Sequence, residues 1–351
     1  MPSIAKPIAR HPSLQRNELG LTIRDYEGSM STLCAGCGHD SITAAIIRAL
    51  WEVSMPPHML AKMSGIGCSS KTPTYFVGGA HGFNSAHGRM AAIATGANAA
   101  NRELTYIGIS GDGDSLSIGL GHLCHAIRRN VKMVYVIENN GVYGLTKGQF
   151  SATADAGSTS KKGVENADSP IDLVGLAVQL GASFVARSFS GDKAQLTPLI
   201  KAAFEHRGAA FIDVISPCVT FNNHDGSTKS FDYVREHNIA LNSLDFISGR
   251  APIEIDYGEG ETQTVALHDG TAIRLRKLDA EHDWRDRSAA LAALERHRAV
   301  GEIVTGLIYL DQDARDLHTR LNTSKRPLNQ LGESELCPGA KALQALNASL
   351  R

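Results

Sequence analysis

Two short polar motifs, separated by one strand-helix-strand unit, are the first candidates for chemistry in this sequence. Gly111-Asp112-Gly113 places a carboxylate between two glycines, and Asn139-Asn140 places two amides near the end of the same unit. Carboxylate and amide oxygens are hard ligands that suit Mg²⁺, which completes its octahedron with phosphate oxygens and water. From the residue types alone, the pattern fits a metal-bridged diphosphate, a nucleotide-binding turn or a structural turn.

Four cysteines form a second candidate set. Cys34 and Cys37 stand in CAGCGHD before a predicted helix, Cys68 follows a predicted strand in SGIGCSS, and Cys218 follows another in VISPCVT. These are element ends, where loops can converge, and we expect the helix dipole to favour the thiolates of the first pair. Four thiolates suit zinc or a 4Fe-4S cluster, and the ligand count does not separate these two.

The two remaining cysteines are not expected to take part in this chemistry. Cys124 lies within a predicted helix, in GLGHLCHAI, and is interpreted as a core thiol. Cys337 precedes a proline in the charged C-terminal part, and we assign it no role.

Composition restricts the class of protein. The chain has 351 residues, with 35 lysines and arginines against 36 aspartates and glutamates, so no excess positive charge indicates nucleic acid or an anionic membrane. The first 20 residues lack the apolar core of a signal peptide, and no apolar run approaches a membrane span. We therefore expect a soluble cytoplasmic protein, in which six cysteines are more often metal ligands than disulfides.

Helices and strands alternate along most of the chain, which predicts an α/β fold with a doubly wound parallel sheet. Helical periods cover 41–53, 88–102, 114–130, 172–182 and 192–206, and strand patterns cover 58–65, 104–110, 132–138, 183–189 and 209–216.

This topology positions the first candidate set. Asp112 follows the strand 104–110, and Asn140 follows the strand 132–138, with the helix 114–130 between them. A right-handed crossover between parallel strands brings the two side chains to the same sheet edge. The amino end of the intervening helix would present free N–H groups to a phosphate there.

The chain divides into three predicted regions. Residues 1–30 are proline-containing and aperiodic, which indicates an arm laid over a partner or a domain surface, and residues 31–240 form the main domain. Within that domain, residues 146–169 are polar and small, and we expect a surface loop near the site or a plain solvent loop. Residues 241–351 form a smaller C-terminal extension with short strands and a charged helix.

The motif pair resembles the thiamine diphosphate motif, in which GDG is followed after some 25 residues by NN. By that resemblance, Asp112 and Asn140 ligate Mg²⁺ and the carbonyl of Val142 completes the protein ligands. The resemblance also implies that the cofactor lies against Gly111, Gly113, Asp114, Gly144 and His87.

Most of the chain resembles the β subunit of the 2-oxoacid:ferredoxin oxidoreductases. The likeness includes the segments CAGCGH, GIGCSSK, AHGR, GDGD, ENNGVYGLTKGQ and SPC. The C-terminal segments LHDGTAIRLRKL, GEIVTGLIYLD and LNTSKRPLNQL are similar to the 2-oxoglutarate branch of that family. The resemblance implies that one 4Fe-4S cluster is held by Cys34, Cys37, Cys68 and Cys218.

The resemblance implies a specific reaction. It is the thiamine-dependent oxidative decarboxylation of 2-oxoglutarate with CoA to succinyl-CoA and CO₂, with electrons passed through the cluster to ferredoxin, and it is reversible in principle as CO₂ fixation. The family places the pyrimidine-binding module on a separate α subunit, so we expect an αβ or (αβ)₂ assembly and an inactive isolated chain.

Several single residues have two interpretations. The resemblance suggests that His87 lies beside the cofactor, whereas a histidine capping the next helix is the structural alternative. Lys71 is a candidate partner for the distal carboxylate of the substrate, with Leu145 as part of the pocket wall, but a solvated lysine also fits. Lys147 has the same two interpretations, and His39 is expected to orient the CxxC loop.

Other functions stay open at this point. The substrate could be pyruvate or a broad range of 2-oxo acids. A non-redox thiamine lyase with structural zinc would carry the same cysteines, and an iron-sulfur electron carrier with a vestigial cofactor site is a third alternative. The intact pair of Asp112 and Asn140 argues against the third.

Overall fold

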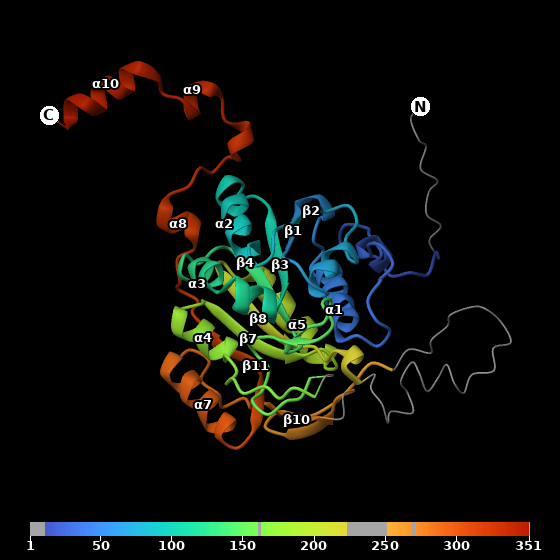
Figure 1. Ribbon diagram of the computed structural model, residues 1–351. Coiled ribbons are helices and arrows are strands. Elements are labelled where there is room, and N and C mark those ends of the chain that lie inside the picture. The colour runs from blue at the N-terminus through green and yellow to red at the C-terminus, as the bar shows by residue number, and fades with distance from the viewer. Residues whose placement is uncertain (1–10, 161–162, 223–250, 269–270, 351) are drawn as a thin grey trace.

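A nine-stranded sheet forms the centre of the computed structural model, which describes residues 11–350 except 161–162, 223–250 and 269–270. The strand order among these residues is β2-β1-β3-β4-β8-β7-β11-β10-β9 (Figure 1). The strands are β1 (Leu60–Ser64), β2 (His81–Asn84), β3 (Thr105–Gly111), β4 (Met133–Asn139), β7 (Phe184–Phe189), β8 (Ala209–Ile215), β9 (Thr262–Ala266), β10 (Ala272–Lys277) and β11 (Glu302–Leu310). A separate hairpin pairs β5 (Val142–Tyr143) with β6 (Gln149–Phe150).

The six strands from β2 to β7 are all parallel, which confirms the predicted doubly wound arrangement. The C-terminal strands continue the same sheet, because β11 pairs antiparallel with β7 and β10 pairs parallel with β11. β9 pairs antiparallel with β10 and is the last strand at this edge of the sheet. The predicted domain boundary near residue 240 lies outside the described residues.

Helices cover both faces of the sheet (Figure 1). α1 and α5 contribute to one buried cluster, and α2, α3, α4 and α7 contribute to the other. The helices are α1 (Gly38–Glu52), α2 (Met90–Ala100), α3 (Leu120–Arg128), α4 (Leu173–Leu180), α5 (Lys193–Glu205), α7 (Arg287–Ala299), α8 (Leu317–Leu321), α9 (Glu333–Leu336) and α10 (Gly339–Ser349).

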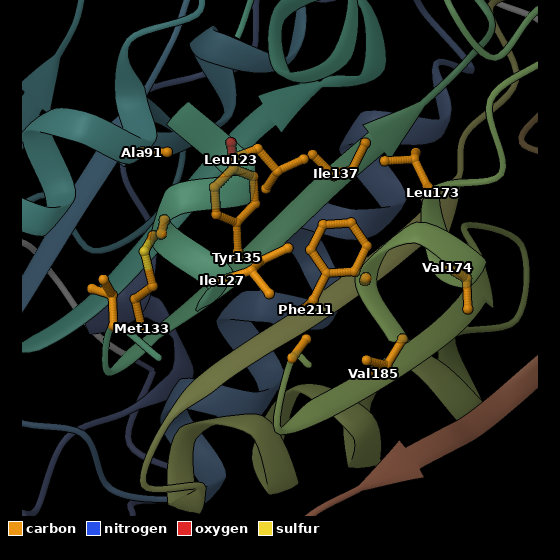
Figure 2. Close-up of a cluster of buried hydrophobic side chains, with 14 of the residues drawn as sticks. Ala91, Leu123, Ile127, Met133, Tyr135, Ile137, Leu173, Val174, Val185 and Phe211 are labelled. Carbon is orange, nitrogen blue, oxygen red and sulfur yellow. The ribbon is translucent and has the colours of Figure 1, made fainter. Parts of the chain in front are cut away.

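Alternation along the strands explains the two cores. On β4, Met133, Tyr135 and Ile137 belong to the cluster beneath α2, α3 and α4, while the intervening valines face α1 and α5. Tyr135 packs on Phe211 of the neighbouring β8, with 6.0 Å between their ring centroids (Figure 2). Burial of this strand on both faces is the reason that 133–137 is a continuous apolar run.

The single helix predicted over 114–130 is wrong. Residues Gly113–Ile118 form a π-helical turn, and α3 begins only at Leu120. Gly119 separates the two, and a Cβ there would lie 2.7 Å from the carbonyl oxygen of Gly88. The backbone of the Gly88 loop therefore packs directly on this junction, and a continuous α-helix is replaced by a widened turn beside the candidate site.

The N-terminal segment lies over the chain's own main domain. Tyr26 is fully buried, its hydroxyl donates to the carbonyl of Met55, and the side-chain amide of Asn17 donates to the Tyr26 oxygen. At the other end of the chain, α9 and α10 project away from the sheet (Figure 1). Within the described residues, no helix has both the length and the apolar character needed to cross a membrane.

β1 carries a buried lysine that holds a turn in place. Lys62 Nζ donates to the carbonyls of Phe76 at 2.6 Å and Val77 at 2.9 Å. Val77 has a φ of +38°, which a β-branched residue rarely adopts, so these contacts fix an unfavourable backbone conformation. Burial lowers the pKa of the Lys62 ammonium to about 8.

This shift predicts a pH dependence of stability. An unfolded lysine titrates near pH 10.4, so between about pH 8 and 10 the unfolded chain binds more protons at this residue than the folded chain. The Lys62 contribution to the unfolding free energy therefore rises with pH, by at most about 1.4 kcal/mol per unit. Urea unfolding from pH 7 to 10 should show wild type gaining stability relative to Lys62→Met. Parallel curves for the two proteins would contradict the assignment.

Candidate functional site

The predicted functional segments meet at the carboxyl edge of the parallel strands. The loops that follow β1, β3 and β4 enclose a cavity of about 100 Å³. It is lined by residues from all three loops, among them Cys68, Asp112, Asp114, Asn140 and Leu145, and by His87 from the loop before α2. The crossover therefore does bring Asp112 and Asn140 together, as the sequence predicts.

Asp112 is the buried acid of this cavity. Its side chain is only 1% exposed, and its carboxylate accepts hydrogen bonds from the hydroxyls of Ser151 and Thr153 and from the backbone N–H of Asn140. Burial raises the pKa of the carboxyl, and these hydrogen bonds oppose the shift. A cation bound here would stabilise the charged form of a carboxylate that burial otherwise disfavours.

Asn140 and Val142 lie on the turn after β4. The side-chain oxygen of Asn140 accepts a hydrogen bond from the Val142 N–H at 3.1 Å, and Gly141 between them has a φ of +71°. On the opposite side, the Tyr143 hydroxyl donates to the carbonyl of Gly113. A Cβ on Gly113 would lie 2.5 Å from the Tyr143 ring, so this close approach of the two loops requires glycine.

Two hydroxyl residues that support Asp112, Ser151 and Thr153, were not singled out from the sequence. Thr153 also donates to the Asn139 side-chain oxygen at 2.8 Å, and Asn139 donates to Asp213 on β8 at 3.1 Å. Ser151 and Thr153 belong to the polar loop 146–169, which the sequence predicted only as a surface loop, near the site or plainly solvated. Nothing in a run of small polar residues indicates which hydroxyls reach a particular carboxylate.

Asp114 holds the cavity walls together. Its carboxylate accepts hydrogen bonds from the backbone N–H groups of Ile66 and Gly88 and from the Ser110 hydroxyl, and the His87 ring nitrogen Nδ1 contacts the same group. The side chain is 3% exposed. These contacts tie the loops after β1 and before α2 to the end of β3. Asp114 therefore stabilises the loops that form the cavity wall.

His87 lines the cavity and does not cap the next helix, which were the two interpretations that the sequence left open. Its ring lines the cavity and stands edge-on to Tyr143, with 6.3 Å between ring centroids. Its contact with Asp114 fixes the ring orientation. It does not cap α2, whose N-cap residue is Arg89.

The four predicted cluster cysteines approach one another beside this cavity. A Cβ built on Gly144 would lie 3.4 Å from the Cys68 sulfur and 3.6 Å from the Cys218 sulfur, so one loop touches both. Burial raises the pKa of the Cys68 thiol, and so do the neighbouring Cys218 and Cys34 thiols. The Cys37 pKa is likewise raised by burial first and by Cys218 among its neighbours.

At Cys37, burial opposes the stabilisation of the thiolate that is expected from the helix dipole. Cys37 is the N-cap of α1, but it is 7% exposed, and the loss of solvation outweighs the hydrogen bond from the His39 backbone N–H. No group of three histidine, cysteine or acidic side chains in the described part of the chain converges on a single-ion site. In a 4Fe-4S cluster each thiolate binds its own iron, so the sulfurs need not converge on one point.

Of the remaining leucine, lysine and cysteine residues considered from the sequence, only Leu145 lines the cavity. Leu145 lines the cavity and is 54% exposed. Lys71 lies close enough to lower the pKa of the Cys68 thiol, but it does not line the cavity. Lys147 is exposed in a turn, with a φ of +79°. Cys124 is partly buried in α3 and does not line the cavity.

Comparison with known proteins places this site in a family. Residues 65–214 match the family model described as thiamine pyrophosphate enzyme, C-terminal TPP binding domain. The chain is 35% identical over 217 residues to the 2-oxoglutarate synthase subunit KorB of Methanocaldococcus jannaschii, and the match covers 60% of this chain and 78% of that protein. The chain belongs to the β subunits of the 2-oxoacid:ferredoxin oxidoreductases. It thus carries a thiamine diphosphate-binding domain.

Other members of this family are also similar. KorB of the 2-oxoglutarate oxidoreductase from Mycobacterium tuberculosis is 42% identical over 204 residues, which are 58% of this chain and 53% of that protein. The β subunit of a 2-oxoacid:ferredoxin oxidoreductase from Saccharolobus solfataricus is 43% identical over 191 residues, 54% of this chain and 63% of that protein. The matched region therefore spans little more than half the length of these two relatives.

A solved structure matches over a longer part of the chain. It is the 2-oxoglutarate:ferredoxin oxidoreductase from Magnetococcus marinus with 2-oxoglutarate, coenzyme A and succinyl-CoA bound. The TM-score is 0.68 at 31% identity, and the match covers 89% of this chain and 91% of that chain.

The packing of Asp114 predicts the effect of one methyl group. A Cβ on Gly65 would lie 1.7 Å from the Asp114 carboxylate, whereas a Cβ on Gly82 in β2 meets no atom within 4 Å. Gly65→Ala should lower the unfolding free energy by about 1–3 kcal/mol, the usual range for overpacking. Gly82→Ala is the control, and both are measured by urea unfolding. Equal stability of the two variants would show that Asp114 moves without cost.

Proposed function

We propose that this chain is the β subunit of a 2-oxoglutarate:ferredoxin oxidoreductase that forms succinyl-CoA and CO₂ and passes electrons to ferredoxin. The observation that carries the proposal is the position of Gly144, whose loop lines the cavity beside Asp112 and also touches the Cys68 and Cys218 sulfurs. A diphosphate site and a set of thiols thus share one wall, which suits electron transfer over a short path.

The residues of the cavity fit Mg²⁺ and a diphosphate. Asp112 and Asn140 would hold Mg²⁺ through side-chain oxygens, and Val142 would contribute its carbonyl. Ser151 and Thr153 would keep the Asp112 carboxylate oriented for the ion. His87 would lie beside the cofactor, held by Asp114.

The cysteines fit a 4Fe-4S cluster in the same proposal. Cys34, Cys37, Cys68 and Cys218 would each ligate one iron. When bound, thiamine diphosphate supplies an electron sink for decarboxylation of a 2-oxo acid, and an iron-sulfur cluster accepts the electrons one at a time. Zinc in the same position would provide no electron transfer.

The size of the cavity supports a need for a second subunit. Its volume of about 100 Å³ is below the usual ~300–1,000 Å³ of a complete ligand pocket. We therefore assign the aminopyrimidine side of the cofactor site to an α subunit, in an αβ or (αβ)₂ assembly. CoA and ferredoxin are the further partners in this proposal, as the names of the relatives suggest.

The choice of 2-oxoglutarate as substrate is supported by the similar structure with that ligand bound and by the KorB relatives. The Saccharolobus solfataricus relative has a broader name at a similar identity, so a wider range of 2-oxo acids is the alternative. Among the described residues, no lysine or arginine lines the cavity. If Lys71 serves the distal carboxylate, its side chain must reach the substrate from beside Cys68.

The cluster assignment is tested by replacing a cysteine. Cys68→Ser should lose most of the iron and sulfide, together with the brown colour and the EPR signal of the reduced cluster, because serine is a poor iron ligand. The control is Cys124→Ser in α3, which should keep all three. Both variants are purified anaerobically with the α subunit and analysed for iron, sulfide, zinc and thiamine.

Two results would overturn this proposal. A colourless wild-type protein containing zinc and thiamine would indicate a non-redox thiamine lyase. A Cys68→Ser variant with full iron, a normal EPR signal and wild-type ferredoxin reduction would exclude Cys68 as a ligand.

The substrate assignment is tested at Lys71. Loss of one charge-assisted contact to a carboxylate should lower kcat/KM for 2-oxoglutarate about ten- to a hundredfold in Lys71→Ile and affect pyruvate much less. The assay compares both substrates with the α subunit present, so that pyruvate is the internal control for a general loss of activity. An equal loss on both substrates would show that Lys71 serves the common chemistry or the fold. A wild-type preference for pyruvate would overturn the substrate itself.

A further inference from the structure

A buried polar cluster lies beside the cysteine loops, and Glu138 at its centre has no role in the function proposed above. Glu138, near the end of β4, is 0% exposed. The Thr72 hydroxyl donates to its carboxyl group, at 3.0 Å from each oxygen. His39 Nδ1 lies 3.5 Å from Glu138 Oε2 and forms a 2.6 Å hydrogen bond with the Ser216 hydroxyl.

Each member of this cluster belongs to a different functional segment. His39 follows Cys37 by two residues, and Thr72 follows Cys68 by four residues. Ser216 precedes Cys218 by two residues. Glu138 itself precedes Asn140 by two residues, so the cluster connects all three cysteine segments to the strand that leads to the thiamine site.

The buried polar cluster around Glu138 has little freedom to rearrange. Thr72, His39 and Ser216 are each at most 1% exposed, so water cannot replace a lost protein partner. The start of α1 is also packed on this point, because a Cβ on Gly38 would lie 2.5 Å from the Ser216 oxygen. A displacement of one segment would therefore leave buried polar atoms without partners or bring the others with it.

We propose that Glu138 is a positioning residue that holds the three cysteine segments at fixed places relative to one another and to Asn140. The thiols are then already in position when the 4Fe-4S cluster is inserted, and they lie at a fixed distance from the thiamine cavity. Glu138 acts through Thr72 and His39 and does not itself touch a cofactor. The inference rests on the proposed cysteine ligands, and its test separates the two.

The test uses variants that remove this connection in different ways. Glu138→Leu removes both oxygens, Glu138→Gln keeps one as an acceptor for Thr72, and Thr72→Val removes only the hydroxyl from the Cys68 segment. The matched control is Tyr135→Phe, which removes a buried hydroxyl from the same strand, 2.8 Å from Ser115, without touching a cysteine segment. All are purified as the complete enzyme with the α subunit, under anaerobic conditions.

The readouts are independent of turnover. They are iron and sulfide per chain, resistance of the cluster to an iron chelator, and the EPR spectrum and reduction potential of the cluster. Glu138→Leu and Thr72→Val should lose iron to the chelator about tenfold faster than wild type, as expected when residues that orient metal ligands are removed. Both should also show altered EPR signals, whereas Glu138→Gln should restore most of the wild-type behaviour and Tyr135→Phe should match wild type.

The outcomes distinguish this inference from the function on which it rests. A wild-type enzyme without iron would overturn the proposed function. An iron-containing wild type together with a Thr72→Val variant of unchanged chelator resistance, EPR spectrum and potential would overturn the role of Glu138 alone. Equal iron loss in Tyr135→Phe would show a general loss of stability and would also overturn it. Because Thr72→Val and Glu138→Gln conserve size, the test holds even if Glu138→Leu fails to fold.

Discussion

The site depends on the parallel pairing of four neighbouring strands, in the order β1, β3, β4 and β8. Strands that run in the same direction end at the same edge of a sheet, so the loops after them are forced together. Cys68, Asp112, Asn140 and Cys218 follow these four strands and are separated by up to 150 positions in the sequence. No local interaction could gather them. The long-range register of the sheet does so, and the two buried cores on its faces stabilise that register.

The end of β4 has a central place at this edge. Three consecutive residues serve three networks: Glu138 contacts Thr72 and His39, Asn139 joins Thr153 to Asp213, and Asn140 turns into the cavity. Successive side chains of a strand point to opposite faces, which separates the first two networks. A change in the register of β4 would move all three at once. The cysteine loops and the cavity are therefore parts of one connected polar structure.

Buried acids and close backbone contacts restrict which residues fit around the cavity. Asp112 and Asp114 are both almost fully buried, and each is surrounded by hydroxyl and N–H donors that replace water. Gly65 is packed against the Asp114 carboxylate, and Gly144 is packed against two cysteine sulfurs. At Gly65 a methyl group has no room, whereas a Cβ on Gly144 would be in ordinary van der Waals contact with the two sulfurs. These restrictions explain why a cavity wall made of short loops can hold a defined shape.

The sequence by itself determined most strands and helices of the main domain, the parallel sheet and the meeting of Asp112 with Asn140, because apolar periodicity and the handedness of crossovers are local or general rules. It also identified the family. It did not predict β2 or the break between Gly113–Ile118 and α3. Only the tertiary structure decided that the C-terminal strands extend the sheet, that Gly113–Ile118 is a π-helical turn, and that Cys37 is buried at the start of α1. It also selected Ser151, Thr153, Asp213 and Thr72 as partners of the site's acids and amides. Burial and hydrogen-bond partners depend on residues that are distant in sequence, so no pattern within one segment can specify them.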